Sequence, residues 1–173
     1  QHIIGPLRAS VIYDLPIFLA YLSIIPGMAV FLVRMETDFS EAYDRFYNAV
    51  REGDTIGRIN QFRDEMVLVA RNGIYEICKV QGLTIILLFL WGEELLNAIG
   101  ISTLYLPLFY IDLVAVGVQL ILLAIQNVLF YLDARGINVF LCALFLASNI
   151  VFTFITIKMG ASFYGYGFAG ATL

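Results

Sequence analysis

The chain has 173 residues, of which 61% are hydrophobic and 14% are charged, and its formal net charge is -4. Ordinary soluble domains contain roughly 45–50% apolar and about 25% charged residues. A globule of this length could not bury so much apolar surface, so the composition predicts an integral membrane protein rather than a soluble one. The small net charge argues against a nucleic-acid partner.

Four apolar runs are long enough to cross a membrane, which takes about 20 residues. Each run is continuous rather than alternating with period two, so we expect an all-α, polytopic helical membrane protein and not a barrel. The predicted spans are residues 11–33, 74–91, 104–132 and 137–157. Another apolar run starts after residue 165, and the chain opens without an initiator methionine. We therefore expect residues 1–173 to be a fragment of one membrane domain in a longer protein.

The segment between the first two spans, residues 34–71, carries 14 of the 24 charged residues. Its apolar residues recur at helical spacing, which predicts two amphipathic helices lying on the membrane surface. A solvated connector is the alternative. Asp38 and Glu41 have the spacing of a capping box for the first helix, and Gly53 is placed to end it. The second helix is predicted to begin near Thr55 and to continue without a break into the second span.

Basic residues predict the orientation of the spans. Six of the ten lie in residues 34–71, and Arg135 lies in the turn at 133–136, on the same side of the membrane. The opposite side has only Arg8 and Lys158. By the positive-inside rule, residues 34–71 and 133–136 are predicted to be cytoplasmic.

Several polar side chains lie within the predicted spans and are candidates for a substrate path or for coupling. Asp14 and Asp112 come first, because a carboxylate at membrane depth costs on the order of 2.5–3.5 kcal/mol and usually faces a cavity or a partner. Hydration at the headgroup level is the alternative for both. Gln119, Gln126 and Asn127 either hydrogen-bond between helices or line a polar path.

The sequence gives no sign of catalytic chemistry. Cys78 and Cys142 lie in apolar runs, and the single histidine is His2. We therefore expect no catalytic residues, no metal site and no cofactor. Glu76 and Lys79, three residues apart at the start of the second span, are expected to form an ion pair that eases their burial.

Four motifs resemble the Pel exopolysaccharide transporter family, the PelG-type inner-membrane proteins. They are YDLPIFLAYLSIIP at 13–26, RMETDFSEAYDRFY at 34–47, FYLDARG at 130–136 and FYGYGFA at 163–169. The resemblance covers essentially the whole chain. That family is related to the multidrug/oligosaccharidyl-lipid/polysaccharide flippase superfamily, in which two helical lobes enclose a central cavity. The resemblance implies that this chain is part of the C-terminal lobe, holding the eighth to eleventh spans and the start of the twelfth.

The same resemblance implies a function and partners. A PelG-type protein is expected to export an N-acetylhexosamine-rich exopolysaccharide across the bacterial inner membrane for the biofilm matrix, by alternating access and without enzymatic activity. The implied partners are a cytoplasmic glycosyltransferase and membrane subunits that sense cyclic di-GMP, and Arg45 and Arg51 are predicted docking residues. An ion-coupled small-molecule exporter of the same superfamily and a non-transporting scaffold of a polysaccharide synthase remain alternatives.

Overall fold

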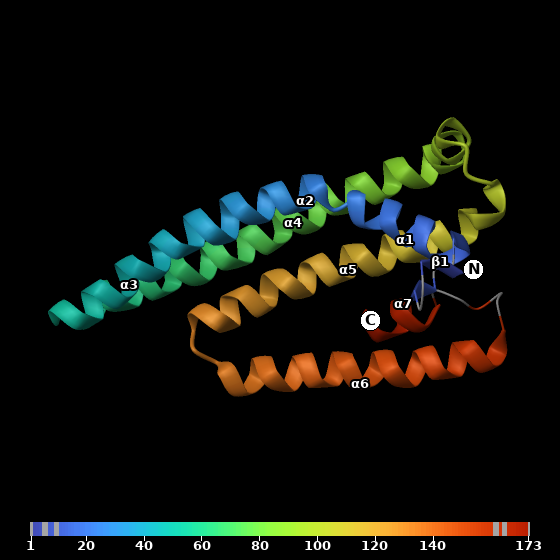
Figure 1. Ribbon diagram of the computed structural model, residues 1–173. Helices are drawn as coiled ribbons and strands as arrows, with labels where there is room; N and C mark the ends of the chain where they lie inside the picture. Colours follow the sequence, from blue (N-terminus) through green and yellow to red (C-terminus); the bar gives the residue numbers. More distant parts are fainter. Residues whose placement is uncertain (1, 5–6, 9–10, 161–162, 164–165, 173) are drawn as a thin grey trace.

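Long helices run side by side in the computed structural model, which describes residues 2–4, 7–8, 11–160, 163 and 166–172 (Figure 1). A short antiparallel pair of strands, β1 (His2–Ile4) and β2 (Leu7–Arg8), precedes the helices. The helical elements are α1 (Val11–Leu22), α2 (Ile25–Phe31), the π-helix η1 (Leu32–Phe39), α3 (Ser40–Glu52), α4 (Ile56–Ile99), the 3-10 turn η2 (Thr103–Tyr105), α5 (Leu106–Tyr131), α6 (Arg135–Met159) and α7 (Tyr166–Thr172).

Judged by length and composition, three helical segments could cross a membrane: α4, η2 with α5, and α6. A fourth crossing results if the bent pair Asp14–Leu22 and Ile25–Glu52 is taken as one span. This confirms the predicted all-helical, polytopic class. The pair is bent by 42° just before Pro26. Proline has no backbone N–H and its ring pushes on the preceding turn, which accounts for the break.

Helix α4 is longer than a bilayer is thick. Its 44 residues span about 66 Å, roughly twice the hydrocarbon core. It starts directly after Thr55 and continues through the predicted second span without interruption, as the sequence analysis predicted. The charged first part of the helix thus forms one rigid rod with the apolar second part.

Helix α3 packs against the first part of α4 and forms with it the charged hairpin, residues 40–71. Ala42 of α3 and Met66 of α4 are buried in one cluster with Phe39, the last residue of η1, and Tyr43 and Phe46 of α3 pack around them. The apolar faces expected to lie on a membrane surface therefore cover each other, which corrects that expectation. In Figure 1 the hairpin projects beyond the turn between α5 and α6 and lies at the same end of the bundle as this turn.

The first helix of the charged segment does not begin with a capping box. The π-helix η1 continues directly into α3, so Asp38 is inside a helical segment and its carboxylate accepts a hydrogen bond from Arg34. The prediction failed because the chain does not leave the helical conformation before Ser40. Gly53 does end α3, in a left-handed conformation with φ of 73° that glycine adopts without strain.

Helix α5 is the centre of the packing. Its Phe109, Leu113 and Val116 are buried with residues of α1 and α4, and its Leu120 and Ala124 are buried with residues of α2, η1 and α4. Helix α6 stands apart, because Asn138 is the one residue described in it that is buried. Apolar side chains cover most of its exposed surface, as expected for a helix that faces lipid.

Candidate functional site

A cavity of about 300 Å³ lies where the break between α1 and α2 meets α5 and α6. Gln119 and Gln126 both line it, so the structure brings these two candidates together. Its wall is formed by Tyr21, Ile24, Val116, Gln119, Leu120, Leu122, Leu123, Gln126, Cys142 and Phe145. A mainly apolar wall with a few polar groups is typical of sites that bind small organic molecules or parts of larger ones.

The polar groups of the cavity come from three helices. The hydroxyl of Tyr21 on α1 donates a hydrogen bond of 2.8 Å to Oε1 of Gln119 on α5. Nε2 of Gln126 donates to Sγ of Cys142 on α6 at 3.4 Å, and Nδ2 of Asn138 donates to the backbone oxygen of Gln126 at 3.2 Å. One hydroxyl and two amides therefore offer both donors and acceptors to a polar ligand.

Asn127 lies outside this cavity. Its Nδ2 donates a hydrogen bond of 2.9 Å to Oε1 of Glu36, which joins α5 to η1. Two roles were expected for Asn127, a hydrogen bond between helices or a place along a polar path. The contact with Glu36 is of the first kind. Asn127 therefore links helices at the base of the charged hairpin.

The two aspartates occupy different surroundings. Asp112 is completely buried, and neither of its carboxylate oxygens has a hydrogen-bond partner among the residues that the structure describes. It precedes Gln119 by seven residues on the same helix, and thus lies in the same row of side chains. Asp14, in the first turn of α1, is exposed.

Two buried polar residues at the α1–α2 break were missed by sequence reasoning. Nε2 of Gln81 on α4 donates to the backbone oxygen of Ser23 at 3.4 Å, and the Ser23 hydroxyl donates to the backbone oxygen of Ala20 at 2.6 Å. A Cβ added to Gly27 would lie 2.5 Å from both Oε1 of Gln81 and Cδ2 of Leu120. Glycine therefore leaves room for these two side chains in their present positions. The sequence indicates Gln81 only as a further polar residue in the predicted second span, shortly after Glu76 and Lys79.

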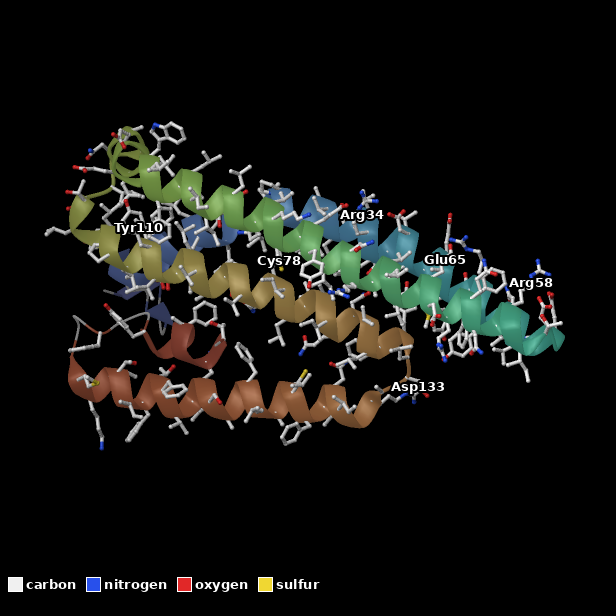
Figure 2. All side chains as sticks on the ribbon, turned by 180° about the vertical axis from the view of Figure 1, so that it is seen from behind. Arg34, Arg58, Glu65, Cys78, Tyr110 and Asp133 are labelled. Carbon is white, nitrogen blue, oxygen red and sulfur yellow. The ribbon has the colours of Figure 1, made fainter. Side chains whose placement is uncertain are left out.

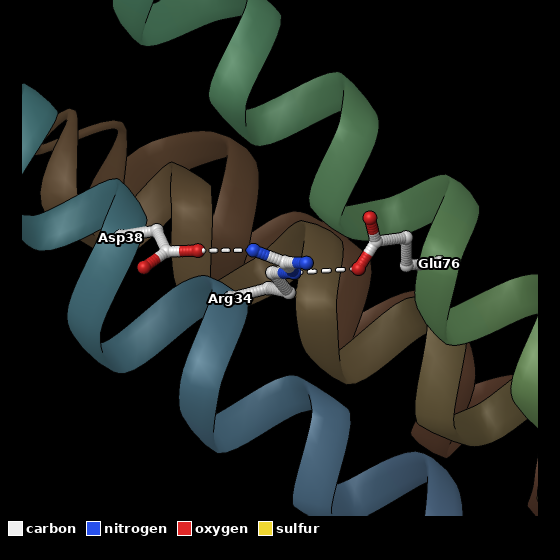
Figure 3. Close-up of polar contacts among 3 residues, drawn as sticks. All are labelled: Arg34, Asp38 and Glu76. Carbon is white, nitrogen blue, oxygen red and sulfur yellow. Dashed lines mark hydrogen bonds and ion pairs between the residues drawn. The ribbon is translucent and has the colours of Figure 1, made fainter.

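Salt bridges made by Arg34 fix η1 against α4 at the base of the charged hairpin (Figure 3). Arg34 donates to Oδ2 of Asp38 at 2.7 Å and to Oε2 of Glu76 at 2.5 Å. Glu76 therefore pairs with Arg34 and not with Lys79, which corrects the expected ion pair, because η1 brings a closer cation to the carboxylate. The hydrogen bonds to Asp38 and then to Glu76 raise the pKa of the Arg34 guanidinium above its ordinary value.

The docking candidates lie on the charged hairpin, along which Figure 2 labels Glu65 and Arg58. Arg45 on α3 pairs with Glu65 on α4 at 2.9 Å, so its guanidinium helps to hold the two helices together. Arg51 is exposed in the last turn of α3. Of the two, Arg51 is the more open to a partner.

Comparison with known families places the chain. Residues 1–173 match the family model described as "PelG: Putative exopolysaccharide Exporter (EPS-E)". The chain belongs to the PelG family. Neither a curated protein sequence nor a solved structure matches it.

Membership of the PelG family gives the broad function. The family is one of exopolysaccharide exporters, so a polysaccharide is the substrate and the role is non-enzymatic. The multi-pass membrane helices described above are what such an exporter requires. Among the polar candidates of this PelG chain, Gln119 and Gln126 line a cavity on a helix long and apolar enough to cross a membrane.

Proposed function

We propose that this chain forms part of the C-terminal lobe of an inner-membrane transporter that exports an N-acetylhexosamine-rich exopolysaccharide for the biofilm matrix. The observation that carries the proposal is the cavity beside α5. Gln119 and Gln126 of this membrane-length helix line the cavity together with apolar residues. Two such lobes would expose the path alternately to the two sides of the membrane.

The chemistry of the cavity suits a sugar unit that carries an acetamido group. Ring hydroxyls and the acetamido group both donate and accept hydrogen bonds, as do the amides of Gln119 and Gln126 and the hydroxyl of Tyr21. The apolar wall, which includes Leu123 and Phe145, can cover the C–H face of a pyranose ring and the acetyl methyl group. Binding of this kind is weak at each unit, which suits a polymer that has to keep moving.

The other candidate residues, Asp112, Asp14 and Asn127, lie outside the cavity. Asp112 extends the row of Gln119 and Gln126 along α5. Asp14, exposed on α1, belongs to one mouth of the path, and Asn127 fixes α5 to η1.

The bend between α1 and α2 can act as a hinge that changes the shape of the cavity. Tyr21 lies in α1 just before the break, Ile24 lies within the break, and both line the cavity, so a change of the 42° bend would change the shape of the cavity. The carbonyl of Ser23 is held by a single long hydrogen bond from Gln81, which a small rotation can release. Hinges commonly lie at such element ends.

The charged hairpin is the proposed docking surface for the cytoplasmic glycosyltransferase and for the subunits that sense cyclic di-GMP. It projects past the α5–α6 turn (Figure 1), and Arg51 is exposed in the last turn of α3. Because α4 is continuous, a partner bound at the hairpin would act directly on the helix that contacts the α1–α2 break.

The experiment measures polysaccharide secretion by cells whose own exporter gene is replaced by a variant. Replacing both Gln119 and Gln126 by leucine should strongly reduce secreted polymer at an unchanged protein level, because the path loses its hydrogen-bonding groups. Gln61→Leu makes the same chemical change on an exposed face of the charged hairpin and should leave secretion at the wild-type level. A non-transporting scaffold predicts wild-type secretion from the double variant as well, and that result would reject the proposal.

The buried Asp112 favours one second candidate, an ion-coupled small-molecule exporter of the same superfamily. Such a protein would move a small molecule across vesicle membranes in an ion-dependent way without any polymer.

A further inference from the structure

Asp112 stands out among the buried polar groups because it is a potential charge without a partner. Its side chain is 0% exposed, and both carboxylate oxygens lack a hydrogen-bond donor in the described part of the chain. The buried residues around its turn of α5 are apolar, namely Phe109, Leu113 and Val116. Helices α1, α4 and α7 pack against α5.

The protonation state that fits such a site follows from the cost of burial. An ionised carboxylate that loses its water without gaining a donor or a cation costs several kcal/mol, and more at membrane depth. The neutral acid costs much less, because only a hydroxyl and a carbonyl are then buried. In this conformation the structure therefore accommodates Asp112 as a protonated acid.

A polar row connects Asp112 to the cavity. Asp112, Gln119 and Gln126 are spaced by seven residues, so neighbouring members lie about 10 Å apart along one side of α5. Tyr21 links this row to α1, because its hydroxyl donates a hydrogen bond to Gln119. The neighbouring Ala20 of α1 packs in the same buried cluster as Phe109 and Leu113 of α5. A change at the α1–α2 bend would therefore alter both the cavity and the packing around the turn of α5 that holds Asp112.

Other titratable groups on the helices that pack against α5 are less suited to carry a proton through the membrane. On α1, the hydroxyl of Tyr21 is hydrogen-bonded to Gln119. Asp14 on α1, Glu93 and Glu94 on α4, and Tyr166 on α7 are exposed.

We propose that Asp112 is the proton-binding group through which a transmembrane proton gradient drives this exporter, an inference that rests on the proposed transport function. The carboxylate binds a proton when the site opens to the side of higher proton concentration, and an O–H bond forms. The neutral acid stays buried during the conformational change. The O–H bond breaks when the site opens to the other side, and the same proton leaves there.

The first test is independent of any polymer. Infrared spectra of the full-length protein in lipid nanodiscs at neutral pH should contain the C=O stretch of a protonated carboxylic acid. We expect the band in the wild type and in Glu94→Gln, a control at an exposed carboxylate of α4, and its loss in Asp112→Asn. Absence of the band from the wild type, or its persistence in Asp112→Asn, would overturn the inference.

The second test follows proton movement with a pH-sensitive dye inside vesicles that contain the full-length protein. Polymer-dependent acidification should be lost in Asp112→Asn and retained in Asp112→Glu, which keeps a titratable carboxyl, and both variants are checked for monodispersity. Acidification by Asp112→Asn at the wild-type rate would contradict the inference. If the wild type shows the infrared band but moves no polymer, the proposed function fails and proton binding stands. If the wild type exports polymer but shows no band, the proposed function stands and proton binding by Asp112 fails.

Discussion

The hydroxyl of Tyr21 makes a hydrogen bond that joins α1 to the cavity wall on α5. Tyr21→Phe removes the donor to Gln119 but keeps the ring, which also packs 6.4 Å from the ring of Phe168 on α7. We expect reduced polymer secretion with a loss of stability of only about 0.5–1.5 kcal/mol, the usual contribution of one hydrogen bond. Secretion and thermal unfolding of the purified protein measure the two effects. Tyr47→Phe on the charged hairpin is the control, and equal secretion by the two variants would contradict the role of the bond.

At the scale of single residues, spacing within one helix was predictable and contact between helices was not. The seven-residue spacing of Gln119 and Gln126 places them in one row whatever the rest of the chain does, and the structure has them at one cavity. The partner of Glu76 is 42 positions away in the sequence, at Arg34, and depends on how η1 packs against α4. Local spacing to Lys79 could not reveal it.

The junction of α2, α4 and α5 is an element-scale feature that a pair of glycine substitutions tests. Gly27→Ala would place a Cβ 2.5 Å from Oε1 of Gln81 and Cδ2 of Leu120, so these two buried side chains must shift and we expect a loss of about 1–3 kcal/mol. Gly82→Ala adds the same methyl on α4, where no atom lies within 4 Å. There we expect no loss, or a gain of up to about 1 kcal/mol from helix propensity. Chemical denaturation in detergent measures both, and equal effects would contradict the close packing.

The boundaries of the elements were predictable where one residue decides them. Gly53 ends α3 and Thr55 precedes α4 as the sequence indicated, because a left-handed glycine and an extended residue interrupt a helix whatever surrounds them. The predicted capping box at the start of α3 failed for a different reason, because it depends on contacts with the rest of the chain. Asp38 has the chemistry of a cap, yet its carboxylate binds Arg34, and the π-helix carries the chain onward. Apolar periodicity likewise predicted the amphipathic faces but not that they would pack on each other.

At the scale of the whole molecule, the charged hairpin and the α5–α6 turn lie at the same end of the bundle (Figure 1), as the predicted shared side requires. In a protein with Cys78 and Cys142 replaced by alanine, a single cysteine at Arg51 should react with a membrane-impermeant thiol reagent in inverted vesicles but not in intact spheroplasts. A cysteine at Thr103, exposed at the opposite end, should show the reverse pattern. The opposite labelling of both sites would overturn the predicted cytoplasmic location.

In the transport path proposed here, polymer crosses the membrane along the polar row of α5. The most direct measurement is flux of a labelled N-acetylhexosamine oligosaccharide across vesicles that contain the purified full-length protein. We predict saturable flux for the wild type and Gln61→Leu, reduced to the level of protein-free vesicles when Gln119 and Gln126 are both leucine. Equal flux with and without the two glutamines, or no flux from the wild type, would contradict the account.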